Sequence, residues 1–92
     1  MEKQENTIQI SAKDEDLKGI YSNNVMIQHG QGEFVLDFLS IFQPRGILAS
    51  RIILSPAHAK SFLKALQQNI GLYEKKFGAI PEEEIAPRGM VN

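Results

Sequence analysis

The sequence contains no cysteine, which excludes disulfides and thiolate metal sites and fits a reducing compartment. It has no apolar run near the ~18 residues that a membrane-spanning helix needs. Residues 1–16 are polar and acidic, without the apolar segment of a secretory signal. We therefore expect a cytoplasmic protein with no membrane partner.

An excess of positive charge is also missing, since the formal net charge is -1 at pH 7. A nucleic-acid binder needs a basic face, so we expect no nucleic-acid partner. No metal-binding HExxH or Walker-type sequence occurs, and the serines have no evident base partner. Gly30 and Gly32 lack the remaining glycine of a dinucleotide fingerprint and separate two strand-like segments. The sequence therefore predicts no enzymatic activity, no cofactor and no bound metal.

Two groups of titratable residues are better explained as structural. His29 and His58 are the only side chains expected to titrate near neutrality, and no metal-ligand spacing joins them. The triplet Glu82-Glu83-Glu84 lies in a proline-bounded segment, where a run of charge is usually solvated.

What the sequence does contain is a well-marked helix over residues 55–78. Ser55 is a good N-cap, Pro56 suits the first helical position, and Gly78 can end the helix. Apolar residues recur at spacings of three and four and form what we call the helix stripe. The helix stripe consists of Ala59, Phe62, Leu63, Leu66, Ile70, Tyr73 and Phe77. Leu72 lies off this stripe, where it can contact a partner or the C-terminal tail.

Three strand-like segments, 20–29, 33–42 and 47–54, precede this helix. Turn signals at Gly30–Gly32 and Gln43–Gly46 separate them, which predicts an antiparallel meander. Asn23 and Asn24 are poor strand formers and indicate an irregular edge or a bulge in the first strand. The expected fold class is α+β, with three strands followed by one long C-terminal amphipathic helix (βββα).

The expected domain organisation is simple. Residues 17–78 form one domain, and residues 79–92 form an acidic, proline-containing tail. Residues 1–16 form an N-terminal arm, in which the alternation at Thr7–Ser11 allows either a flexible segment or a fourth edge strand.

Short turns fix an expected register, and the register assigns side chains to the two faces of the sheet. The expected opposite pairs are Val25 with Phe38, Ile27 with Leu36, Phe38 with Arg51, and Phe42 with Ile47. One helix can cover only one face of the sheet, so the other face needs a second copy, or else the arm and the tail must cover it. The predicted dimer interface on that second face is centred on Val35, Leu39, Ile41, Leu48 and Ile52.

Asp37 and Arg51 are charged residues inside otherwise apolar strands. Such residues are half-exposed or ion-paired, or they mark a binding groove. The sequence leaves these alternatives open.

Most of the chain, from Leu17 to Gly78, resembles domain-of-unknown-function family 3467, a family of short prokaryotic proteins. The segments that carry the resemblance are Tyr21-Ser22-Asn23 with Val25, Glu33-Phe34 with Leu36-Asp37-Phe38, Arg51-Ile52-Ile53-Leu54-Ser55-Pro56 with His58-Ala59-Lys60, Tyr73-Glu74, and Phe77-Gly78. This resemblance implies no particular activity. At the level of fold alone, the chain is similar to SecB-type export chaperones, which also combine an antiparallel sheet with a C-terminal helix and associate through their sheets.

We therefore expect a small homodimeric interaction or structural module without catalytic activity. The alternatives are a SecB-like peptide-binding chaperone or export factor and a nucleic-acid-associated accessory protein. A chaperone needs accessible apolar surface after assembly, whereas a nucleic-acid binder needs a basic face and a steep dependence on salt.

Overall fold

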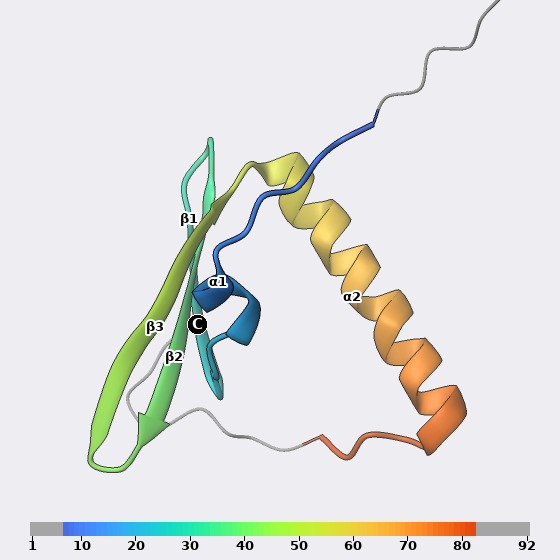
Figure 1. Ribbon diagram of the computed structural model, residues 1–92. Coiled ribbons are helices and arrows are strands. Elements are labelled where there is room, and N and C mark those ends of the chain that lie inside the picture. Colours follow the sequence, from blue (N-terminus) through green and yellow to red (C-terminus); the bar gives the residue numbers. More distant parts are fainter. Residues whose placement is uncertain (1–6, 83–92) are drawn as a thin grey trace, which may run out of the picture.

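The computed structural model describes residues 7–82 and confirms the α+β fold, with one short helix added (Figure 1). The elements are α1 (Asp14–Lys18), β1 (Asn24–His29), β2 (Phe34–Phe42), β3 (Arg45–Leu54) and α2 (Pro56–Phe77). The strands form one antiparallel sheet in the order β1-β2-β3. Most of the expected C-terminal tail, including Glu83 and Glu84, lies outside the described residues.

The hairpin between β1 and β2 has the predicted register. Val25 lies opposite Phe38, and Ile27 lies opposite Leu36. The Gly30 N–H donates to the Glu33 carbonyl oxygen at 3.0 Å, which closes the turn around the two residues between them.

β1 begins four residues later than predicted. Before Asn24, most hydrogen bonds to β2 involve side chains, where a regular strand would use backbone groups. The Asn23 side chain donates through Nδ2 to the Ile41 carbonyl and accepts from the Ile41 N–H through Oδ1, both at 2.9 Å. Ser22 Oγ donates to the Leu39 carbonyl at 2.9 Å, and Ser40 Oγ donates to the Tyr21 carbonyl at 2.6 Å. The irregularity expected from Asn23 is therefore an amide side chain that bonds to β2 as a backbone peptide would.

The hairpin between β2 and β3 differs from the prediction. The strands continue through Phe42 and Arg45, which lie opposite each other, so only Gln43 and Pro44 form the turn. The Gln43–Pro44 peptide bond is cis. An irregularity follows at Phe38/Leu39, where Phe38 pairs with Ser50 and Leu39 pairs with Leu48. A bulge of this kind places two residues of one strand opposite one of the other and exchanges the faces beyond it.

The observed register defines two sheet faces. The helix-side face contains Val25, Ile27, Phe34, Leu36, Phe38, Phe42, Ile47, Ile52 and Leu54. The outer face contains Met26, Val35, Asp37, Leu39, Ile41, Leu48, Arg51 and Ile53. The predicted pairs of Phe38 with Arg51 and of Phe42 with Ile47 are wrong, because the shorter turn and the bulge shift β3 along β2.

α1 crosses the predicted boundary between the N-terminal arm (residues 1–16) and the domain (residues 17–78). Its first turn carries three acidic residues, Asp14–Asp16, and the Lys13 N–H donates to Asp16 Oδ2 at 3.0 Å. Gly19 ends the helix with a φ of 78°, a conformation that glycine adopts without strain. Residues 7–11 form no strand, and the side chains of Ile8 and Ile10 are exposed.

α2 begins and ends as predicted. The Ser55 hydroxyl accepts a hydrogen bond from the His58 N–H at 3.1 Å, and the Gly78 N–H donates to the Glu74 carbonyl at 2.9 Å. Its position is not as predicted, because the helix diverges from the sheet after leaving β3 instead of covering a face (Figure 1). No residue of α2 is buried. Ser55 alone separates the two elements, and this connection directs the helix away from its own sheet.

Asn23→Ala should lower the free energy of unfolding by about 1–3 kcal/mol, because it removes two hydrogen bonds and leaves the Ile41 backbone without its partner. Urea denaturation at a fixed protomer concentration measures this change. Asn69→Ala is the matched control, because Asn69 is exposed and its amide bonds only within α2. Equal effects of the two substitutions would contradict the bridging role of Asn23.

Candidate interaction surfaces

An ion pair lies at the centre of the outer face. Arg51 Nε donates to Asp37 Oδ1 at 2.7 Å, and Arg51 Nη2 donates to Asp37 Oδ2 at 2.9 Å. The two residues are direct cross-strand partners on β2 and β3. The Asp37 side chain is 7% exposed and that of Arg51 is 58% exposed, so the pair presents its guanidinium to solvent.

This geometry keeps Asp37 ionised. Hydrogen bonds from Arg51 lower the pKa of Asp37, with a further contribution from the positive charge of Arg51, and they outweigh the opposing effect of desolvation. The same hydrogen bonds and the negative charge of Asp37 raise the pKa of Arg51. The two side chains thus satisfy each other and form an ion pair within the sheet.

The outer face around this pair is apolar. Four of the five residues predicted for the dimer interface, Val35, Leu39, Ile41 and Leu48, share this face with the ion pair. The fifth, Ile52, pairs with Leu36 on the helix-side face, so the placement of Ile52 with the other four is wrong. The bulge at Phe38/Leu39 is the cause, because it lies between Leu48 and Ile52.

The second candidate surface is the helix stripe itself. Its large side chains are all substantially exposed: Phe62 40%, Leu63 55%, Leu66 46%, Ile70 40%, Tyr73 50% and Phe77 66%. Ala59, at the sheet end of the stripe, is half-buried. The rest of the helix stripe is therefore left without a partner in a single chain.

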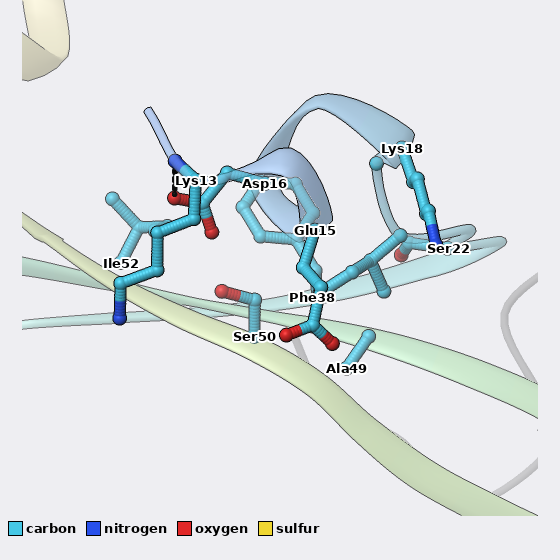
Figure 2. Close-up of a pocket in the computed structure, with 11 residues that line it drawn as sticks. Lys13, Glu15, Asp16, Lys18, Ser22, Phe38, Ala49, Ser50 and Ile52 are labelled. Carbon is cyan, nitrogen blue, oxygen red and sulfur yellow. Dashed lines mark hydrogen bonds between the residues drawn. The ribbon is translucent and has the colours of Figure 1, made fainter. Parts of the chain in front are cut away.

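α1 lies over the helix-side face with a hollow of about 750 Å³ beside it (Figure 2). Phe38 and Ile52 from the sheet and Ile20 from the connection line its apolar part. Charges of both signs line the rest, among them Lys13 and Glu15, so the hollow favours no single class of ligand. Two apolar residues here are also exposed: Leu17 in α1 at 76%, and Ile20 after it at 71%.

The histidines and Leu72 are not drawn into a common site. His29 stacks on Phe34 with ring centroids 5.4 Å apart, and the His58 backbone N–H donates to Ser55 Oγ, the N-cap of α2. Leu72 is 65% exposed and lines a small hollow with Tyr73 and Ile80 at the C-terminal end of α2. Among residues 7–82, no group of three His, Cys, Asp or Glu side chains is arranged to hold a metal ion. No helix of this part of the chain is long and apolar enough to cross a membrane.

Sequence reasoning fell short at two features of these surfaces. It missed α1, although acids at 14–16, a lysine at 18 and a glycine at 19 are typical of a short helix. For Asp37 and Arg51 it named an ion pair as one alternative but placed Phe38 opposite Arg51, although opposite charges directly across neighbouring strands stabilise the register that pairs them.

The sequence model of a family described as protein of unknown function (DUF3467) matches residues 1–82. No curated protein and no solved structure matches the chain significantly. The resemblance to SecB-type chaperones thus gains no support from solved structures.

Arg51→Met should destabilise the protein more than Asp37→Asn, because it leaves a buried carboxylate unpaired, whereas Asp37→Asn leaves an exposed guanidinium. Arg45→Met, at the exposed hairpin, is the matched control for loss of an arginine. Chemical denaturation of the three variants at pH 7 measures the order. A larger loss for Asp37→Asn than for Arg51→Met would contradict the burial of the ion pair.

The same pair should make stability depend on pH with a defined sign. Because the folded-state pKa of Asp37 is lowered, its contribution is fully present above the pKa of the unfolded chain and is lost as the pH falls through the folded-state pKa. The difference in unfolding free energy between wild type and Asp37→Asn should therefore shrink as the pH is lowered from 7 into this acidic range. A difference independent of pH would show that the charge of Asp37 contributes nothing to folding.

Proposed function

This chain belongs to DUF3467, a family of proteins of unknown function, and we propose that it is a homodimeric protein-interaction module without catalytic activity. The proposal places it in the cytoplasm, which suits a chain without cysteine. It needs no cofactor, because the charged side chains that come together in the sheet, Asp37 and Arg51, bond to each other.

The unpartnered helix stripe is the observation that carries the proposal. Six large apolar side chains, each 40–66% exposed, leave roughly 500 Å² of apolar surface in water if each contributes about 80 Å². Soluble monomers rarely leave a contiguous patch above a few hundred Å² uncovered. Covering it would contribute about 12 kcal/mol per protomer at ~25 cal/mol per Å², before the costs of association.

The small core of the single chain points the same way. Leu36 and Leu54 are the only large apolar side chains that are buried among the described residues. A domain of this size usually buries about 60% of the surface of its unfolded chain, and even then its stability is marginal. A second copy supplies the missing buried area, and self-association into a symmetric pair is the commonest solution.

Two other functions have some support in the structure. Exposed apolar surface on the sheet and on α2 is what a SecB-like peptide-binding chaperone requires. The lysines of α2, at positions 60, 64, 75 and 76, are the only feature that favours a nucleic-acid-associated role. Both are less favoured, because a dimer would cover much of the apolar surface and the net charge of -1 opposes nucleic-acid binding.

Sedimentation velocity at micromolar concentration should give a species of twice the 10.3 kDa chain mass. Leu66→Glu should reduce it to a monomer, because the new carboxylate would be buried without a partner in the dimer. Leu72→Glu is the matched control, because Leu72 lies on the same helix, off the helix stripe, at 65% exposure. A wild type that sediments as a monomer would overturn the proposed dimer.

A pull-down with the full chain distinguishes the three functions. A stable partner at fixed stoichiometry supports the interaction module. A heterogeneous set of unfolded polypeptides supports the chaperone, and recovery that is lost after nuclease treatment supports the nucleic-acid-associated role.

A further inference from the structure

We infer that the two copies exchange their long helices: α2 of each protomer lies along the helix-side face of its partner's sheet, in the opening between that sheet and the partner's α2. This inference rests on the proposed homodimer and specifies which surfaces form it. It moves the predicted interface away from the outer face, because the outer face lies on the side of the sheet away from both helices (Figure 1).

The opening exists because a protomer cannot easily close α2 onto its own sheet. Ser55 is the single residue between β3 and α2, and it is extended, with φ -68° and ψ 156°. The following Pro56 restricts Ser55 to this region, and the bond from the His58 N–H to Ser55 Oγ fixes the first helical turn. Connections between packed elements usually have two to six residues, so one restrained residue leaves little freedom to fold the helix back.

The two surfaces that face this opening are both apolar and both incomplete. On one side is the helix stripe, of which only Ala59, at the sheet end, is half-buried. On the other side are Ile27 and Ile52 of the sheet, 41% and 42% exposed, and Ile20, 71% exposed, which lines the hollow together with Ile52. A partner's helix stripe placed here would meet these apolar side chains beside α1, which lies over the same face.

The dimensions of the elements match. The 22 residues of α2 span about 33 Å at 1.5 Å per residue. β3 has 10 residues and spans about 33 Å at ~3.3 Å per residue, and β2 is one residue shorter. One α2 helix is therefore as long as the face that it would cover, and symmetry covers both sheets with the same contact.

The charges are complementary as well. α2 carries four lysines and one acidic residue, Glu74. Over the helix-side face, residues 13–18 carry three acidic residues in the first turn of α1 and two lysines, Lys13 and Lys18, so their net charge is negative. An α2 helix arriving from a second copy would bring its lysines beside the acidic first turn of α1.

The natural absence of cysteine makes the arrangement directly testable by cross-linking of introduced thiols. Ile52→Cys in one tagged chain is mixed with Leu63→Cys, Leu66→Cys or Ile70→Cys in a second, differently tagged chain. The mixtures are unfolded and refolded together to exchange subunits, then treated with a short thiol-reactive cross-linker. At least one of the three helix positions should give a covalent product that carries both tags, because together they cover two turns of the helix stripe.

Two matched controls distinguish the faces. Ile53→Cys replaces Ile52→Cys, because the two residues are neighbours in β3 but lie on opposite faces, at 58% and 42% exposure. Leu72→Cys replaces the stripe positions on α2. Neither control should give the mixed product at a comparable yield, and circular dichroism should show that all variants remain folded.

The outcomes separate this inference from the proposed dimer. Suppose that the wild type is a dimer and that, in the variants, Ile53→Cys cross-links to the helix while Ile52→Cys does not. This result would overturn the exchange and place the contact on the outer face. Cross-links that form only between two copies of the α2 variants, and not between the sheet and α2, would overturn the exchange in favour of a dimer of paired helices. A doubly substituted Ile52→Cys/Leu66→Cys chain that closes within one protomer would also overturn it, whereas a monomer in sedimentation would remove the dimer itself.

Discussion

The single-residue connection at Ser55 is the constraint on which the rest of this structure depends. Because Pro56 holds Ser55 extended and Ser55 caps α2, the strand and the helix are joined almost rigidly, and the helix leaves the sheet. A longer loop would allow the helix stripe to cover its own sheet and complete an ordinary two-layer domain. With this connection, one chain carries two complementary apolar surfaces that do not meet, and a second chain is the simplest way to bring them together.

The bulge in the second hairpin is the next constraint, because it decides which residues belong to which surface. Leu48 stays with Leu39 on the outer face, whereas Ile52 moves to the helix-side face opposite Leu36. The Asp37–Arg51 pair fixes this arrangement chemically, since a one-residue slip would separate the two charges and leave a buried carboxylate unpaired.

Local signals in the sequence predicted the three strands and the long helix but not α1, and the larger errors concern the long-range arrangement. The caps at Ser55 and Gly78 and the turn at Gly30–Gly32 are encoded within a few residues, so the helix bounds and the first register could be predicted. The second register depended on a bulge at Phe38/Leu39 that no local residue type marks. The divergence of α2 depended on the geometry of one residue, which the hydrophobic pattern of the helix does not report.

The ion pair also bears on what the outer face can bind, because in the proposed dimer this face stays uncovered. A chaperone surface must accept many sequences, and such surfaces are apolar and adaptable. Here the centre of the apolar patch holds the bidentate Asp37–Arg51 pair, and the Arg51 side chain is 58% exposed. The guanidinium of Arg51 has further N–H groups besides the two that bond to Asp37. A partner that covers this patch without offering an acceptor would desolvate the guanidinium at a cost, so the pair selects against purely apolar ligands. Such selectivity would suit the proposed interaction module better than a general chaperone, and it would come from the same pair that fixes the register of the sheet.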